Sequence, residues 1–267
     1  TFRLRLRQNF EDVEWEFKNE IQVMKQISPH HHIISLIASY VCGRDLGMIL
    51  EPVADGGSLD QILRIQHTRV DLEDTMRTIL LRLFGCLADA LAFVHKSRIR
   101  HKDLKPENIL LHRGKPILAD FGVAFNGLNA ETLTTEGVAY GFSRRYCAPE
   151  VVKHGPRNQS SDVFSLGAVF VEIMSAIEEN PYQDLLRPCY AENIENILPT
   201  LEPTSMHWSN YRTFPTIATA SQTSSATVAR VFDASGHKLP NPLLRQLRVF
   251  WDTVLSCRQP RLHWRVL

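Results

Sequence analysis

The spacing of hydrophobic residues divides the first part of the chain into short strands and one helix. Residues 2–7 alternate apolar side chains with arginine, which predicts a strand with one buried face. Residues 11–27 place apolar side chains at steps of three and four, so we expect an amphipathic helix that ends before Pro29. Two more strands are expected at 33–41 and 46–53, joined by a glycine-containing turn.

Helices dominate the pattern in the rest of the chain. They are predicted at 58–65, 74–95, 161–176 and 243–255, with two short strand-like segments at 109–111 and 116–119. The helix at 161–176 is apolar on all sides, which predicts that it is buried. Residues 180–242 hold seven prolines and a run rich in Ser, Thr and Ala, so we expect an insertion or mobile loop there and not a second domain.

Composition narrows the class of protein. The 267 residues include 30 Lys and Arg against 29 Asp and Glu, a net charge of +1 that argues against a charge-driven nucleic-acid binder. No run of 18 apolar residues is present, so no membrane partner is expected either. Five scattered cysteines without a C-x-x-C pair predict neither a zinc site nor a disulfide framework. A reducing compartment is the natural setting, and we expect the protein inside the cell, in the cytoplasm.

The strongest chemical signal is an ordered set of short motifs. It consists of His-Lys-Asp-Leu-Lys-Pro-Glu-Asn at 101–108, Asp-Phe-Gly at 120–122, Ala-Pro-Glu at 148–150 and Asp-Val-Phe-Ser-Leu-Gly at 162–167. This set resembles the protein kinase family, specifically its serine/threonine branch. The resemblance implies an α+β, two-lobed protein kinase-like fold with an incomplete β-rich N-lobe and a mainly helical C-lobe. We expect one kinase domain over 1–267, with the partial N-lobe and hinge at 1–54 and the C-lobe at 55–267.

The resemblance also implies a catalytic set that uses ATP and Mg²⁺. Asp103 would accept or orient the proton of the incoming hydroxyl, and Lys105 would lie against the γ-phosphate. Asn108 and Asp120 would supply the hard oxygen ligands that Mg²⁺ prefers. Such positioning and charge neutralisation are what phosphoryl transfer mainly needs. An acidic solvated loop is the competing interpretation, and it gives no reason for this spacing.

Further residues follow from the same resemblance. Glu20 would be the helix partner of the ATP-binding lysine, although a solvated glutamate on a helix surface is the alternative. Arg5 lies nearest the position of that lysine. The Glu51 carbonyl and the Val53 N–H would meet adenine, and Leu110 would form the floor under the purine ring.

Two supporting residues complete the resemblance. Asp162 would bond the backbone of the catalytic loop, and the Ser143 hydroxyl would bond Asp103 and Lys105. The residue before Ser143 is Phe142, where the family usually has glycine.

Two family features are not visible in the sequence. No glycine precedes Gly43, so the phosphate-covering G-x-G-x-x-G is absent, and no β3 lysine is recognisable. Either the first strands are missing from this chain, which the lack of an initiator Met favours, or the protein does without them. The predicted function is therefore transfer of the ATP γ-phosphoryl group to Ser/Thr hydroxyls of a protein substrate. The alternative is a pseudokinase or inactive fragment that acts as a binding scaffold.

Overall fold

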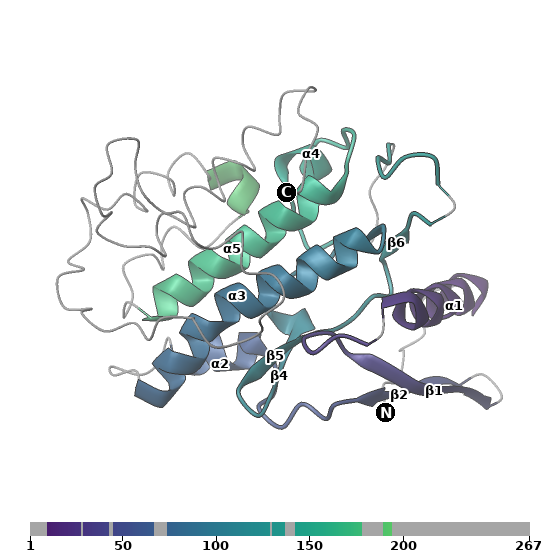
Figure 1. The fold of residues 1–267 in the computed structure, drawn as a ribbon. Helices are drawn as coiled ribbons and strands as arrows, with labels where there is room; N and C mark the ends of the chain where they lie inside the picture. The colour runs from purple at the N-terminus through teal and green to yellow at the C-terminus, as the bar shows by residue number, and fades with distance from the viewer. Residues whose placement is uncertain are drawn as a thin grey trace. The chain divides into compact units, whose positions relative to one another are not determined.

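A computed structural model of the chain describes residues 10–27, 29–42, 45–66, 74–128, 130–136, 142–177 and 189–193 (Figure 1). The predicted strand at 2–7, the helix at 243–255 and most of the expected insertion at 180–242 lie outside these residues.

The first described elements are one helix and one hairpin. Helix α1 (Phe10–Ile27) is followed by strands β1 (Ser35–Cys42) and β2 (Asp45–Glu51), which pair antiparallel. Phe17, Val23, Met24 and Ile27 of α1 are buried, the last two fully, whereas Trp15 is exposed. Gly47 lies opposite Tyr40 in this hairpin, and a Cβ at Gly47 would overlap the tyrosine ring.

Helices and short strands make up the remainder. In chain order they are α2 (Leu59–Gln66), α3 (Asp74–Lys96), β3 (Ile99–Arg100), the 3₁₀ helix η1 (Pro106–Asn108), β4 (Ile109–His112), β5 (Lys115–Leu118), β6 (Phe125–Asn126), α4 (Pro149–Val152) and α5 (Gln159–Ile177). Strands β3 and β6 pair with each other, as do β4 and β5, so the described sheets are all two-stranded and antiparallel. This mixture agrees with the α+β class expected from the sequence.

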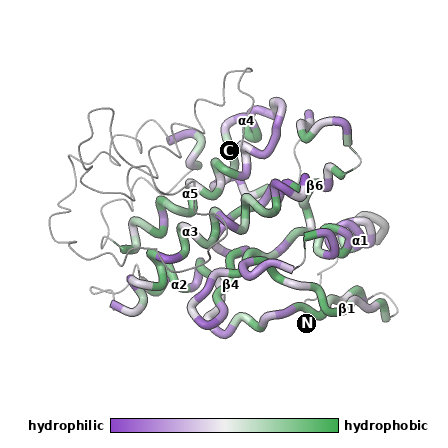
Figure 2. The backbone as a smooth tube through the Cα atoms, viewed as in Figure 1, coloured by the Kyte–Doolittle hydropathy of each residue, from purple (hydrophilic) through white to green (hydrophobic). Residues whose placement is uncertain are grey.

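Helices α3 and α5 pack side by side in the core (Figure 1). The rings of Phe84 on α3 and Phe170 on α5 meet with centroids 4.7 Å apart. Nearly every residue of α5 is buried, which confirms the prediction from the apolar residues on all its sides. Hydrophobic positions recur along this helix, with hydrophilic ones between them (Figure 2). By length and composition alone α3 and α5 could also cross a membrane, but 83% of the most apolar window of α5 is buried inside this fold.

The β4–β5 hairpin sets the geometry on which the site depends. Asn108 immediately precedes β4 and Asp120 closely follows β5, and the hairpin pairs Ile109 with Leu118. The Ala119 N–H donates to the Asn108 carbonyl at 2.9 Å, so the two segments stay together beyond the last strand pair. Two residues that are twelve positions apart in the chain are thereby brought to the same end of one hairpin.

Hydrophobic periodicity located the long elements of the described residues to within two residues at each end. It missed β3, η1, β6 and α4, which are two to four residues long. Elements of two to four residues contain at most about two periods of a strand pattern or one helical turn, which is too little for periodicity to detect. Their formation depends on contacts made elsewhere in the fold.

Candidate active site

Three of the predicted site residues converge in the loop after β3. Lys105 Nζ donates to Asp103 Oδ2, and Asn108 Nδ2 donates to the Asp103 carbonyl at 2.9 Å and to Oδ2 at 3.3 Å. The other carboxylate oxygen, Oδ1, accepts from the Ser143 backbone N–H at 3.0 Å. Donors on both oxygens hold the Asp103 carboxylate in one orientation.

Ser143 joins this network differently from the sequence expectation. Its hydroxyl accepts from Lys105 Nζ at 3.0 Å, as predicted, but Asp103 is bonded by the backbone N–H of Ser143 and not by the hydroxyl. The link to Asp103 therefore depends on the backbone conformation after Phe142.

Asp162 supports the loop from below, which confirms the sequence prediction. At the first turn of α5 its carboxylate is 2% exposed, and it accepts from the backbone N–H groups of His101 and Lys102, both at 2.8 Å. These bonds hold Lys102 at a φ of 71°, in the left-handed region that side chains seldom adopt. His95 Nε2 donates to the same carboxylate at 2.9 Å. Burial would raise the pKa of Asp162, but His95, His101 and the loop N–H outweigh it and lower the pKa.

Asn108 and Asp120 offer a donor set that fits Mg²⁺. The amide nitrogen of Asn108 is committed to Asp103, which leaves the amide oxygen available as a ligand. The exposed Asp120 follows β5 at a φ of 65°, and its Oδ1 has one long bond, 3.4 Å, from the Gly122 N–H. One carboxylate and one amide oxygen, completed by phosphate oxygens, are typical for Mg²⁺, which seldom uses an all-protein cage. The described residues contain no cluster of three His, Cys, Asp or Glu side chains of the kind that other metal centres use.

Glu20 lies on α1 and faces Asp120. A side chain at Gly122 would contact the carboxylates of both residues, 3.5 Å from Asp120 Oδ1 and 3.6 Å from Glu20 Oε2. Burial first, and then the charge of Asp120, raise the pKa of Glu20 to about 7, against a smaller opposite effect of the Phe121 backbone N–H. Within the described part of the chain Glu20 has no ion-pair partner. Glu20 is therefore not a solvated surface glutamate, and it has no cation beside it among the described residues.

We predict that Glu20→Gln stabilises the chain at pH 8 by about 1–3 kcal/mol. The folded chain holds the Glu20 proton up to about pH 7, whereas the unfolded chain releases it near 4.5. The contribution of Glu20 to stability is therefore complete below pH 4.5 and is lost as the pH rises toward 7. Urea unfolding of both proteins at pH 5 and pH 8 measures the difference.

Glu14→Gln is the matched control, because Glu14 pairs with Lys18 on the exposed side of the same helix. It should change stability by less than about 0.5 kcal/mol at either pH. Destabilisation by Glu20→Gln at pH 8 would contradict the prediction and would reveal a cation bound to Glu20.

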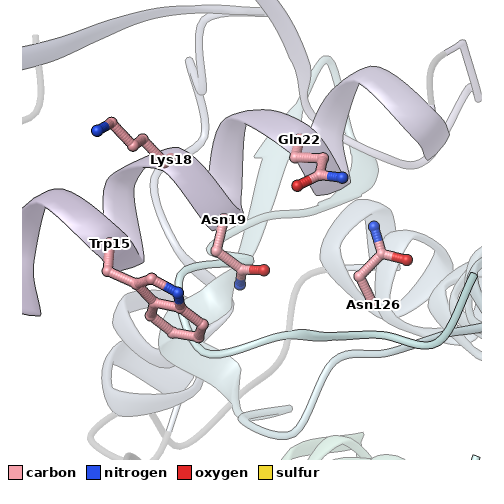
Figure 3. Close-up of a pocket in the computed structure, with 5 residues that line it drawn as sticks. All are labelled: Trp15, Lys18, Asn19, Gln22 and Asn126. Carbon is pink, nitrogen blue, oxygen red and sulfur yellow. The ribbon is translucent and has the colours of Figure 1, made fainter. Parts of the chain in front are cut away.

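Side-chain amides hold α1 against the segment that follows Asp120. Asn19 Nδ2 donates to the Ala124 carbonyl at 3.0 Å, and Asn126 Nδ2 donates to Gln26 Oε1 at 2.8 Å. Between them lies a pocket of about 300 Å³ (Figure 3), lined by Trp15, Lys18, Asn19, Gln22 and Asn126. These bonds keep Glu20 beside Asp120, and the pocket contains none of the predicted catalytic residues.

The predicted adenine contacts are spread along another part of the fold. Glu51 ends β2 and is exposed, and the Val53 side chain is 77% exposed while its carbonyl accepts from His112 Nδ1 at 2.7 Å. Leu110 is half-buried on β4 and bridges to Ser58. Hydrogen bonds link none of these three residues to Asp103 or Asp120. Arg5 lies outside the described residues.

Sequence reasoning missed several buried polar residues around the loop. His95 bonds Asp162 across 67 positions, and no motif links the two. Arg100 and Arg157 are also buried, at 2% and 8% exposure. The only available signal was the position of Arg100 directly before the catalytic motif.

The fold and this site define a class of protein, an α+β domain with a phosphotransferase-type catalytic loop and a candidate magnesium site. The family model described as "Protein kinase domain" matches residues 3–234. The chain belongs to the protein kinase family.

Curated relatives agree with this family. Over 170 residues the chain is 32% identical to "Serine/threonine-protein kinase nekl-2" of Caenorhabditis elegans, which covers 61% of this chain and 46% of the relative. It is 33% identical over 172 residues to "Cysteine-rich receptor-like protein kinase 29" of Arabidopsis thaliana, covering 62% and 24%. It is 30% identical over 196 residues to "Calcium/calmodulin-dependent protein kinase" of Metarhizium anisopliae, covering 70% and 48%. The matched regions span less than half the length of each of these relatives.

Proposed function

We propose that this protein kinase transfers the γ-phosphoryl group of ATP to Ser or Thr hydroxyls of a protein substrate. The observation that carries the proposal is the Asp103 carboxylate, held by Lys105, Asn108 and the Ser143 backbone. Serine/threonine kinases among the relatives support the choice of hydroxyl. An intracellular, cytoplasmic location, without nucleic-acid or membrane partners, remains a prediction from the sequence.

Each residue of the loop has a separate task in this proposal. Asp103 accepts a hydrogen bond from the substrate hydroxyl, orients its oxygen toward the phosphorus and receives its proton. Lys105, already hydrogen-bonded to Asp103 and Ser143, places a positive charge where the transferred phosphoryl group develops negative charge. Since these groups are ordered by one another, little reorganisation is needed when substrates bind.

Asn108 and Asp120 would hold Mg²⁺ through the amide oxygen and the carboxylate. The bound ion would neutralise phosphate charge that the described side chains cannot neutralise alone. A cation near the nucleotide would pair with the Glu20 carboxylate, which faces Asp120.

A second candidate function is a binding scaffold without phosphoryl transfer. The observation that favours it is the position of Glu20, which faces another carboxylate and has no cation among the described residues. The absence of G-x-G-x-x-G from the sequence points the same way. The ordered catalytic loop favours the first candidate, since a scaffold has no need of the Asp103 network.

The experiment combines nucleotide binding with transfer. We expect ATP with Mg²⁺ to raise the melting temperature of the full chain, because a ligand that binds only the folded state stabilises it. Asp120→Asn should lose the part of the shift that requires Mg²⁺, whereas Asp89→Asn, at a side chain that is 72% exposed, should keep it. Phosphate incorporation into a Ser/Thr peptide library, read by mass spectrometry, then separates kinase from scaffold. A shift in melting temperature without phosphate incorporation would support a nucleotide-binding scaffold. The absence of both the shift and the incorporation would contradict the kinase proposal for this chain.

A further inference from the structure

Two buried cysteines from separate segments share one hydrogen-bond acceptor. Cys147 lies just before α4, and Cys189 opens the short described segment at 189–193. Both thiols donate to the Arg144 carbonyl, each with 3.1 Å between sulfur and oxygen. Both cysteines are free, and their residues are only 5% and 4% exposed. The two sulfur atoms are therefore held on one oxygen atom, largely out of water.

The residues next to the two cysteines are bonded to each other as well. The Tyr190 N–H donates to the Arg145 carbonyl at 3.0 Å. The rings of Tyr146 and Tyr190 stack with centroids 5.8 Å apart. Both tyrosine hydroxyls donate to Glu172 Oε1 on α5, each at 3.0 Å. These contacts keep the two thiols at one place in the folded chain.

The surroundings of the pair favour a bond between the two sulfur atoms. Among the described residues no third His, Cys, Asp or Glu completes a metal-ligating cluster with them. A structural metal centre commonly uses four such ligands, whereas a disulfide needs only two cysteines whose side chains meet. Two thiols on one acceptor meet this second requirement.

We propose that Cys147 and Cys189 are a modification site, at which a hydroperoxide converts the two thiols into a reversible disulfide bond. In a reducing compartment the cysteines stay as thiols until an oxidant reaches them. The bond would join the segment before α4 to the segment at 189–193. The proposal does not depend on phosphoryl transfer by this chain.

The reaction balances with hydrogen peroxide as the oxidant. One thiolate attacks a peroxide oxygen, the O–O bond breaks, and the departing hydroxide takes up the proton of that thiol as water. The second sulfur then attacks the sulfenic acid, the S–O bond breaks, and hydroxide leaves with the second thiol proton as another water. Two thiols are oxidised to one disulfide, and one peroxide is reduced to two water molecules.

The Cys147 thiol is protonated at neutral pH. Burial first, and then the neighbouring Cys189 thiol, raise the pKa of Cys147 to about 12, against a smaller opposite effect of the Arg144 charge. The thiolate is the reactive form of a cysteine. We therefore expect the disulfide to form slowly at pH 7 and faster at pH 9.

The disulfide would also fix the turn that supports the catalytic loop. The Cys147 N–H donates to the Ser143 carbonyl at 3.2 Å, and the Ser143 N–H donates to Asp103. A cross-link that closes a loop of about 40 residues restricts the unfolded chain. We expect oxidation to raise the melting temperature by about 5–10 °C. Hydrogen exchange in peptides covering residues 143–147 should slow by about tenfold.

The test treats the folded, full chain with hydrogen peroxide and maps its disulfides by mass spectrometry without reduction. We expect a cross-linked peptide pair that contains Cys147 and Cys189 and lacks two hydrogen atoms. Dithiothreitol should restore both thiols and reverse the rise in melting temperature.

Three variants show which cysteines carry the effect. Cys147→Ser and Cys189→Ser should each lose the cross-link and the rise that dithiothreitol reverses. Cys42→Ser, at an exposed cysteine, is the matched control and should keep both. The peptide map of the wild type decides the question even if neither buried variant folds. The proposal is overturned if both thiols stay free in the folded chain, if either pairs with another cysteine, or if the link forms only after unfolding in urea.

Discussion

Asp103→Asn is expected to lower the rate of phosphoryl transfer by about 10²–10⁴-fold, the range that a positioned proton acceptor supplies. The carboxylate oxygens of Asp103 are held by Lys105, Asn108 and Ser143, so the residue is already oriented for this role. An asparagine amide keeps the shape of the side chain but cannot accept a proton from the substrate. Initial rates of phosphate incorporation into a Ser/Thr peptide measure the effect.

The ATP- and Mg²⁺-dependent rise in melting temperature should survive in Asp103→Asn, because Asp103 is not one of the proposed magnesium ligands. Asp89→Asn is the control for replacing an aspartate by asparagine. The Asp89 side chain is 72% exposed and pairs only with His30 among the described contacts. The transfer rate of Asp89→Asn should match that of the wild type. A transfer rate in Asp103→Asn within tenfold of the wild type would show that another group handles the proton.

Asp162→Asn is expected to destabilise the chain by about 3–5 kcal/mol, the range found when one partner of a buried ion pair is removed. The carboxylate accepts from His95, His101 and Lys102, and all three donors point at its two oxygens. An asparagine replaces one acceptor oxygen with an NH₂ donor, so at least one buried N–H loses its partner. Urea unfolding at pH 7 measures the loss.

The pH dependence gives a second readout of Asp162. Its pKa is lowered in the folded chain, so its contribution is complete above the unfolded value of about 3.9 and is lost as the pH falls through the folded value. The variant should lack this acid-dependent loss. Asp60→Asn, at a surface pair with Arg64, should change stability by less than about 1 kcal/mol. An Asp162→Asn chain as stable as this control would contradict the proposed support of the loop.

The motif residues show how much of the candidate site could be predicted from the sequence. The order and spacing of Asp103, Lys105, Asn108 and Asp120 identified the family and the catalytic loop, because the loop is local and its residues contact one another within a few positions. The Asp162 bonds were predicted by the same resemblance. The Ser143 link was predicted only in part, since the choice between hydroxyl and backbone N–H depends on the local backbone path.

Charge pairing between distant segments could not be predicted. The pairing of Glu20 with an ATP-binding cation stays a prediction, because its expected partner position lies outside the described residues. What the sequence did not predict is that the packing of α1 against the segment after β5 places Glu20 beside Asp120. Arg100 and Arg157 are 57 positions apart, and the fold brings them together, so that Arg100 Nη1 donates to the Arg157 carbonyl at 2.7 Å. A pattern along the chain carries no information about such contacts.

The sequence by itself determined the family, the α+β class, the long helices and the residues of the catalytic loop. These depend on periodicity and on spacing within single segments, which are properties of the chain before it folds. The tertiary structure decided which charges face each other, which buried donors lack an acceptor, and how Asn108 and Asp120 come to share one end of a hairpin. Those features arise from through-space packing of segments that are far apart in sequence, and packing sets both the distances between charges and their removal from water.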